Sequence, residues 1–433
     1  MRCFFALFLA AVFVRGEEAV RLSEAFPVGA RYRVKTRVEL SGSMALPPAK
    51  GKKPESVGVA GISAIDYEER VLGAAANGDV TKTIRTCARF DFRRTLAGQK
   101  QEIALRPEVK RLVVLRKGQT EIPFSPDGPL TWGEMDVVRT DVFVPALRGL
   151  FPADAVKQGD RWRASDSSVQ ELTDLEKIDE GAVECRLDKV IADDKRRFAR
   201  VTFSGTVKGV GEDGPARHSL RGWYTFDLDG SYLSELVLTG TLTMSGPDGK
   251  DLGKIEGRFA LERTTGGTAI DLSEKAIADI KLDPDDQNTR MLYDNPVQGL
   301  RFEYPRAWRI ARDAAGQVTL DGASGSGLLI TLDPPGKSPT VRQLLDESRQ
   351  WMLKQKGEVT RVIPAATLRT SPRLEAFSLE ATMGRQLFWM DYYITEQEAG
   401  GATLAARLVP SELKQSRKEV ENIARSMVIQ RKK

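Results

Sequence analysis

Histidine is nearly absent from this chain. The 433 residues include a single histidine, His218, in the segment GPARHSLRGWY at the start of an expected strand. Hydrolytic triads, most zinc sites and most proton shuttles depend on histidine side chains. We therefore expect no catalytic residues and no metal site, and we expect His218 to be structural or exposed to solvent.

Cysteine is scarce as well. Apart from Cys3, which precedes the apolar segment Phe4–Val14, the chain has two cysteines, Cys87 and Cys185. An exported protein can join two such thiols. Strand alternation, however, places Cys87 on a polar face with Arg85 and Arg89, and Cys185 on an apolar face. This argues against a disulfide bond without deciding the question. Two thiols without histidine do not make a metal site, and no motif indicates a cofactor.

Long apolar segments are limited to one, Phe4–Val14, which follows Arg2 and precedes Gly16. A basic residue, a short apolar run and small residues at the end are the features of a signal peptide. The run is too short to span a bilayer, and no later run approaches the roughly 18–20 residues that a span requires. We expect residues 1–16 to be a signal peptide, the protein to be exported to the periplasm or beyond the cell, and no transmembrane segment to remain.

Net charge is low. The formal charge is +5, and removal of residues 1–16 takes away Arg2 and Arg15, which leaves a charge near +3. Nucleic-acid binding demands concentrated basic charge, so the composition argues against a nucleic-acid partner. Charged residues make up 29% and hydrophobic residues 41% of the chain, which is the balance of an ordinary water-soluble globular protein.

Alternating strands dominate what is present. In residues 30–40, apolar and charged side chains alternate along ARYRVKTRVEL, and similar runs follow near 57–116 and from Gly159 to Thr264. Period-two alternation without intervening helices predicts antiparallel strands rather than a parallel sheet. We expect residues 17–264 to form a large antiparallel sheet or half-barrel. Its apolar face must be covered by curling, by a second sheet or by a ligand.

The last third of the chain has a different pattern. Glycines and the run DPDDQN predict a linker over residues 265–291. Short strands then precede a helix with Thr340 and Gln343 at capping-box spacing, and longer strands lead to a final helix that we expect Ser411 to cap. The expected fold class is therefore α+β and mostly antiparallel, with a second domain over residues 292–430.

The ends of this second domain carry two short motifs. The opening GLRFEYPRAW has Gly299, Phe302, Tyr304, Pro305 and Trp308, and the closing ENIARSM has Glu421, Ile423, Ser426 and Met427. With the order of helices and strands, they make about a third of the chain resemble the PsbP-like α/β/α sandwich superfamily. The resemblance implies that fold and an accessory or binding role, since most members are non-enzymatic. The ion-related role of the plant photosystem proteins is not implied, because no matching ligand set occurs. Residues 17–264 are similar only in style to exported bacterial β-domains of unknown function, including the turn at 159–162.

A basic strand face is the first candidate binding surface. It comprises Arg31, Arg33, Lys35 and Arg37, with Arg85, Arg89 and Arg93 on another strand. If the two strands are neighbours, their cationic face would suit an anionic glycan, lipid headgroups or an acidic partner. The alternative is an ordinary solvated face.

An aromatic strand face is the second candidate. In LFWMDYYI, Trp389 and Tyr393 flank Asp391 on one side of the strand, while apolar residues occupy the other. If helices cover only one side of the sheet, this second face is a contact patch for a partner. The alternative is core packing on both faces.

A carboxylate cluster is the only feature that suggests catalysis. Asp127, Glu134 and Asp136 lie close together in PFSPDGPLTWGEMD, and paired carboxylates serve glycosidases. The alternative assigns Asp127 to a turn, Glu134 to a capping box with Thr131, and Asp136 to solvent.

These observations favour an exported, two-domain binding or envelope-accessory protein without catalytic activity. One alternative is a carrier that shelters an apolar or lipid ligand in the curled sheet of residues 30–264. The other is a carboxylate-dependent hydrolase. The sequence does not identify the protein or envelope component that the chain binds, its biological process or its oligomeric state.

Overall fold

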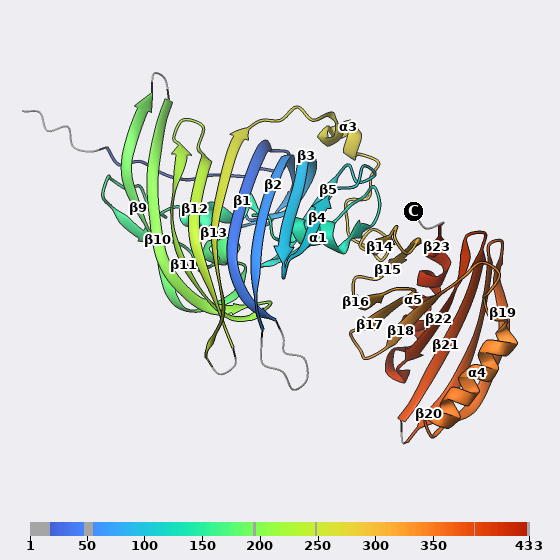
Figure 1. Ribbon diagram of the computed structural model, residues 1–433. Helices are drawn as coiled ribbons and strands as arrows, with labels where there is room; N and C mark the ends of the chain where they lie inside the picture. Colours follow the sequence, from blue (N-terminus) through green and yellow to red (C-terminus); the bar gives the residue numbers. More distant parts are fainter. Residues whose placement is uncertain (1–17, 47–54, 194–195, 247–248, 385, 431–433) are drawn as a thin grey trace, which may run out of the picture. The chain divides into compact units, whose positions relative to one another are not determined.

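The computed structural model describes residues 18–46, 55–193, 196–246, 249–384 and 386–430 (Figure 1). The expected signal peptide, residues 1–16, lies outside this part of the chain. The chain divides into two compact units: unit 1 holds Met1–Pro123 and Val137–Ile280, and unit 2 holds Phe124–Asp136 and Lys281–Lys433. None of the helices in the described ranges has the length and apolar character needed to cross a membrane.

Unit 1 is built on one twelve-stranded sheet. Along the order β6-β5-β3-β2-β1-β13-β12-β11-β10-β9-β8, with β4 beside β3, the pairs from β3 to β8 are antiparallel. This confirms the prediction of a large N-terminal antiparallel sheet. The strands are β1 (Arg31–Leu46), β2 (Glu55–Ala74), β3 (Val80–Leu96), β4 (Gln99–Ala104), β5 (Leu112–Lys117), β6 (Thr120–Phe124), β8 (Arg161–Arg163), β9 (Leu175–Asp193), β10 (Arg196–Gly211), β11 (Gly214–Asp227), β12 (Tyr232–Ser245) and β13 (Asp251–Thr265).

Two faces of this sheet differ in chemistry. The inner face carries buried apolar residues, such as Val34, Leu236 and Tyr224, and is covered in part by η1 (Val144–Leu150) and α2 (Asp166–Thr173). The Tyr224 hydroxyl donates a hydrogen bond of 3.0 Å to the carbonyl oxygen of Leu150 in η1. The side chains between these residues along each strand form the outer face, which is mostly polar.

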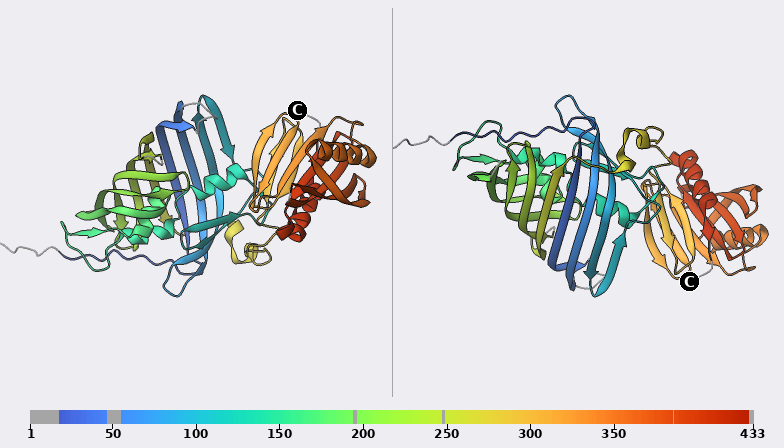
Figure 2. Two further views of the ribbon diagram at one scale, coloured as in Figure 1. Left: turned by 90° about the horizontal axis from the view of Figure 1, so that it is seen from below. Right: turned by 90° about the horizontal axis from the view of Figure 1, so that it is seen from above.

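The sheet bends sharply along its strands. Figure 2 shows β9–β12 running across the direction of β1–β3. The register places glycines from several strands in one row of the inner face, with leucines between them. Since glycine has no Cβ, such a row lets the strands bend and lets neighbouring backbones approach closely. The row consists of Gly61, Leu40, Gly257, Gly240, Leu220 and Gly205.

A β-bulge in β3 reverses its expected alternation. Arg89 pairs with Asp66, but Cys87 pairs with Tyr67, so the register skips Ala88. One extra residue moves every preceding side chain to the opposite face. The prediction that Cys87 lies on the polar face is therefore wrong.

The same bulge places Arg85 on the inner face, where it is 2% exposed. Its guanidinium donates to Glu69 at 2.6 Å and to Asp141 at 3.3 Å, and it lies 4.5 Å from the ring centroid of Tyr67. The expectation that Arg85 joins Arg89 on an exposed basic face is wrong. Arg85 instead neutralises two carboxylates inside unit 1.

Unit 2 contains a seven-stranded sheet with helices on both faces. The face of β21 that carries Phe388, Met390 and Tyr392 packs under α4 (Val341–Lys354), with Met352 in the shared core. On the other face of the sheet, α5 (Leu413–Ser426) contacts β21 and β22. This confirms the expected α+β fold with a C-terminal α/β/α arrangement. The sheet order is β16 (Trp308–Ala314), β17 (Gln317–Gly322), β18 (Gly327–Asp333), β22 (Gly400–Leu408), β21 (Gln386–Gln397), β20 (Arg373–Met383) and β19 (Gly357–Thr370).

The helix starts were predicted with mixed success. The capping box of Thr340 and Gln343 is present at the start of α4. Ser411 does not cap α5, because Pro410–Glu412 form a 3₁₀ turn (η3) and Glu412 takes the cap position without a side-chain hydrogen bond. Proline fixes the backbone dihedral φ and favours such a turn before the helix.

Residues 124–136 pack with unit 2 although they lie between strands of unit 1 in the sequence. Within them, β7 (Leu130–Thr131) pairs in parallel with β14 (Met291–Asn295). Their small sheet has the order β23-β15-β14-β7, in which β15 is Leu300–Tyr304 and β23 is Val428–Ile429. Residues 265–291 hold the 3₁₀ turn η2 (Ile270–Leu272) and the short helix α3 (Glu274–Ile277).

Candidate ligand-binding groove

The basic residues of β1 are neutralised by β2. Arg31 forms an ion pair with Glu68, and Arg33 lies 3.5 Å from the same carboxylate. Arg37 donates to Asp66, and Lys35 stands opposite Asp66 in the register. Since β2 separates β1 from β3, the four basic residues do not merge with Arg89 and Arg93 into one cationic face.

The aromatic face of β21 is covered by α5. Arg417 of α5 donates to both oxygens of Asp391 at 2.7 and 2.9 Å, and its guanidinium lies 5.1 Å from the ring centroid of Trp389. Asp391 is 1% and Tyr393 3% exposed, and burial raises the pKa of Tyr393. The structure brings these three residues together, but beneath a helix rather than on an open face.

Four other residues singled out from the sequence occupy structural positions. Glu134, 1% exposed, accepts from the Thr131 backbone N–H at 2.8 Å in the capping box of α1 (Trp132–Arg139). Cys87 and Cys185 are free thiols, and burial raises the pKa of each to about 12. His218 faces Leu242 on the inner side of the sheet, and burial lowers its pKa to about 4. Within the described ranges, no three histidine, cysteine or acidic side chains are grouped so as to hold a metal ion.

A second buried charge cluster lies near the sheet edge at β5 and β6. Arg116 donates to Glu121 at 2.9 Å and to Glu171 at 2.6 Å, and Glu171 also accepts from the Phe143 backbone N–H. The other oxygen of Glu121 is buried without a hydrogen-bond partner among the described residues. Burial and the nearby Glu171 carboxylate raise the pKa of Glu121 to about 8.

The outer face of the sheet contains two adjoining hollows. The first has a volume of about 530 Å³ and spans β8 to β12, and the second has about 720 Å³ and spans β11 to β2. Arg221 and Thr239 line both hollows. We call the two together the outer-face groove. Since strands lie about 4.8 Å apart, the six steps from β9 to β2 give it a length of about 29 Å.

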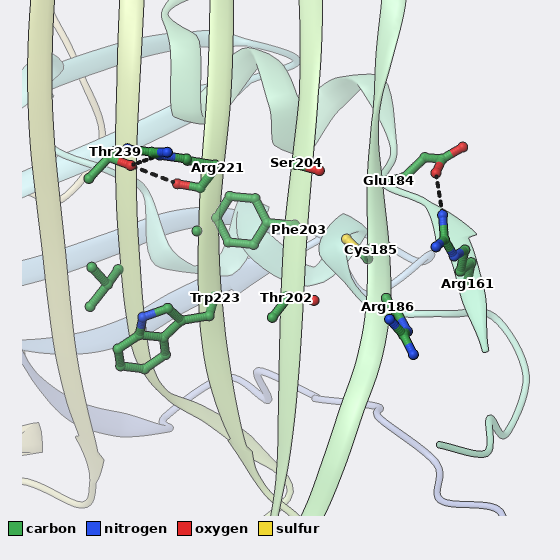
Figure 3. Close-up of a pocket in the computed structure, with 12 residues that line it drawn as sticks. Arg161, Glu184, Cys185, Arg186, Thr202, Phe203, Ser204, Arg221, Trp223 and Thr239 are labelled. Carbon is green, nitrogen blue, oxygen red and sulfur yellow. Dashed lines mark hydrogen bonds and ion pairs between the residues drawn. The ribbon is translucent and has the colours of Figure 1, made fainter. Parts of the chain in front are cut away.

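Two rows of side chains form the walls of the first hollow (Figure 3). One row runs along Thr239, Arg221, Ser204 and Glu184, and the other along Val237, Trp223, Thr202 and Arg186. The floor between the two rows is formed by the backbone of Gly222, Phe203 and Cys185. The side chains of Phe203 and Cys185 point to the inner face of the sheet.

Aromatic and cationic groups stand at opposite sides of the first hollow. Trp223 is half-buried, and the guanidinium of Arg200 lies 3.1 Å from its ring centroid, which fixes the indole by a cation–π contact. Two strands away in the same row is Arg186, about 10 Å distant by strand spacing. The side chain of Arg186 is exposed and has no hydrogen-bond or ion-pair partner among the described residues.

Arg221 and Arg161 are each held by one neighbour. The Nε of Arg221 donates to the Thr239 hydroxyl at 3.2 Å, and Arg161 lies 3.6 Å from the carboxylate of Glu184 (Figure 3). The terminal nitrogens of Arg221 have no acceptor within the described residues. The first hollow therefore presents oriented guanidinium groups to whatever enters it.

The second hollow is richer in hydroxyl groups and has balanced charge. Its lining contains two carboxylates, Glu39 and Glu256, and two guanidinium groups, Arg221 and Arg258. The remaining polar residues are Ser41, Ser219, Thr239 and Thr241.

Sequence reasoning missed this groove because its lining comes from eight strands. Trp223 and Arg186 lie far apart in the sequence and become neighbours only through the register of β9, β10 and β11. The one available signal was Trp223 itself, an aromatic residue at a polar position of an alternating strand.

Comparison with known proteins gives similarity of fold only. No family model matches the chain, and the curated proteins contain no match. Among solved structures, the cyanobacterial PsbP protein CyanoP from Synechocystis sp. PCC 6803 is 13% identical, over 33% of this chain and 92% of its own, with a TM-score of 0.26.

Two further structures are similar over parts of the chain. The Ran-binding protein Mog1p of Saccharomyces cerevisiae is 7% identical over 32% of this chain and 95% of its own, with a TM-score of 0.25. A lipovitellin structure is 10% identical over 56% of this chain and 26% of its own, with a TM-score of 0.31. Identities and TM-scores this low carry no information about function.

Proposed function

We propose that this chain is an exported, non-catalytic binding protein whose outer-face groove binds a linear glycan. The observation that carries the proposal is Trp223, which lines a long open groove beside hydroxyl and charged side chains. An aromatic platform contributes apolar contact to a flat ring, while arginine, glutamate, serine and threonine supply hydrogen bonds to hydroxyl groups.

The geometry favours a glycan over a peptide. A peptide that binds a sheet through its main chain adds to a strand edge, because only there are N–H and C=O groups free. The groove lies across the strands from β9 to β2, whose backbone groups pair with their neighbours. Recognition here must come from side chains.

The charges disfavour a nucleic acid. Glu39, Glu184 and Glu256 line the same groove as its arginines. Closely spaced phosphates would meet these carboxylates, and nucleic-acid sites concentrate positive charge instead. A polymer that is neutral or carries spaced charges fits better.

Two further parts of the proposal come from the sequence. The apolar segment Phe4–Val14 supports export to the periplasm or beyond the cell. The motifs at Gly299–Trp308 and Glu421–Met427 support assignment of unit 2 to the PsbP-like superfamily and an accessory role in the cell envelope.

The test is binding of linear polysaccharides to the full chain and to Trp223→Ala. We expect the variant to lose at least about tenfold in affinity, since burial of an aromatic ring contributes on the order of 2 kcal/mol. Affinity electrophoresis in gels containing each polysaccharide measures it.

Trp351→Ala is the matched control, because Trp351 is 48% exposed on α4 of unit 2. It should bind like the unchanged protein. Equal binding by Trp223→Ala and the unchanged protein would contradict the proposal.

A second candidate is a carrier of an apolar ligand on the inner face. In and beyond the glycine row, four inner-face residues are only partly buried: Leu40, Met44, Leu242 and Ile255. Partly exposed apolar side chains on one face of a sheet can contact a lipid. Native mass spectrometry of protein isolated from its own cell envelope separates the two candidates: a lipid adduct favours the carrier, and its absence with glycan binding favours the groove.

A further inference from the structure

The two halves of the outer-face groove differ in charge. The first hollow has Arg161, Arg186 and Arg221 against a single carboxylate, Glu184. The second hollow shares Arg221 with the first and adds one further arginine, Arg258, against Glu39 and Glu256. Positive charge is therefore concentrated at the β8–β11 end, and the rest of the groove has no excess of it.

The arginines at this end are arranged to accept an anionic group. Arg186 is exposed, with no partner among the described residues, and Arg221 is oriented by Thr239 through Nε, so its two terminal nitrogens point away from that bond. A guanidinium presents paired N–H groups that match the two oxygens of a carboxylate. An arginine fixed in this way loses less side-chain entropy when it binds.

Trp223 stands in the same row as Arg186 and two positions from Arg221 on β11. Figure 3 shows the guanidinium of Arg221 beside Thr239 and that of Arg186 on the opposite side of the hollow, so a single carboxylate cannot contact both. A sugar ring against the indole would place the carboxylates of neighbouring units near one guanidinium or the other. The hydroxyls of Thr202 and Ser204, both exposed, lie on the strand between them.

We propose that the first hollow binds an acidic linear polysaccharide that contains uronic acid, with Arg186 and Arg221 each binding the carboxylate of a different unit and one sugar ring beside Trp223. This rests on the proposed function and adds the chemical class of the ligand. The second hollow then holds adjacent units through their hydroxyl groups.

The experiment is isothermal titration calorimetry of the full chain with two probes: a hyaluronan octasaccharide, in which a uronic acid alternates with a neutral sugar, and neutral cellohexaose. The variants are Arg186→Gln, Arg221→Gln and the double variant. Arg217→Gln is the matched control, because Arg217 is exposed on β11 but lines neither hollow. We expect the double variant to lose at least about tenfold in affinity for the hyaluronan octasaccharide, the effect of one lost charge-assisted hydrogen bond or more. The double variant should therefore lose its preference for the acidic probe, and Arg217→Gln should bind both probes like the unchanged protein.

Each other outcome overturns the inference in a distinguishable way. Equal affinity of the unchanged protein for both probes overturns the acidic specificity but leaves glycan binding in place. Binding of neither probe overturns the proposed function as well. Unchanged affinity of the double variant for the hyaluronan octasaccharide would show that the carboxylates bind elsewhere. Tighter binding of single-stranded DNA than of the octasaccharide would show that the ligand is a nucleic acid. Circular dichroism checks that these exposed substitutions leave the fold intact.

Discussion

At the scale of residues, unit 1 holds several ionised groups away from water. Arg85 lies between Glu69 and Asp141, and Arg116 lies between Glu121 and Glu171. Removing one partner of such a pair leaves an uncompensated charge, while the intact pair adds little net stability. These clusters therefore make stability depend on protonation.

Glu121→Gln tests this dependence. The folded protein raises the pKa of Glu121 from 4.5 to about 8, so its fold prefers the protonated carboxyl. The resulting stability is present below about pH 4.5 and is lost as the pH rises through about 8. Glutamine imitates the protonated form, so we expect the variant to be more stable than the unchanged protein at pH 9, by on the order of 2 kcal/mol, and similar at pH 5. Urea unfolding at both pH values measures the difference.

Glu180→Gln is the control, because Glu180 is an exposed residue of β9 paired with Lys208. Its effect should be small at both pH values, as for surface ion pairs in general. A Glu121→Gln variant less stable than the unchanged protein at pH 9 would mean that the folded state needs the ionised carboxylate.

At the scale of elements, alternation in the sequence predicted most strands but not their irregularities. Residues 30–40 read as a strand, and β1 is Arg31–Leu46. The bulge at Ala88 was not visible, because a bulge is defined by the partner strand and not by the residues of its own strand. The glycine row was hidden for the same reason, since its members align only when the register is known.

The glycine row leads to a prediction at this scale. A Cβ at Gly205 would lie 2.1 Å from the carbonyl oxygen of Ala182, whereas at Gly257 the nearest atom would be 3.5 Å away. We expect Gly205→Ala to separate β9 from β10 locally and to cost about 1–3 kcal/mol, as overpacking does. Gly257→Ala should cost less than 1 kcal/mol. Thermal unfolding of both variants measures the effect, and equal melting temperatures would show that the backbones adjust freely.

The candidate binding residues show the same limit: their strand faces could be predicted, but their surroundings could not. The predicted residues Arg31, Arg33, Lys35 and Arg37 proved to face acidic partners on β2, which the sequence could not reveal without strand order. Trp389, Asp391 and Tyr393 do share a face, as alternation predicted, but α5 covers it. The sequence of one strand does not show which element packs against it.

At the scale of the whole molecule, unit 2 is discontinuous in the sequence. Leu130 and Met135, 1% and 2% exposed, belong to the segment 124–136 that packs with residues 281–433. We expect a fragment of residues 281–433 to be less stable than the same fragment carrying 124–136 through a flexible linker. Burial of these two side chains predicts a difference of about 2–4 kcal/mol. Urea unfolding measures it, with a glycine–serine segment of equal length as the control, and equal stability of all three fragments would show that 124–136 is dispensable.

The pairing of β7 with β14 also has a consequence in time. Leu130 is synthesised before β8–β13, which are half of the strands of unit 1, and its partner Met291 follows only after all of them. Contacts between residues so far apart in sequence close late, because the loop between them must first lose its freedom. Maturation of unit 2 must therefore wait for synthesis to pass β13, although residues 124–136 are made much earlier.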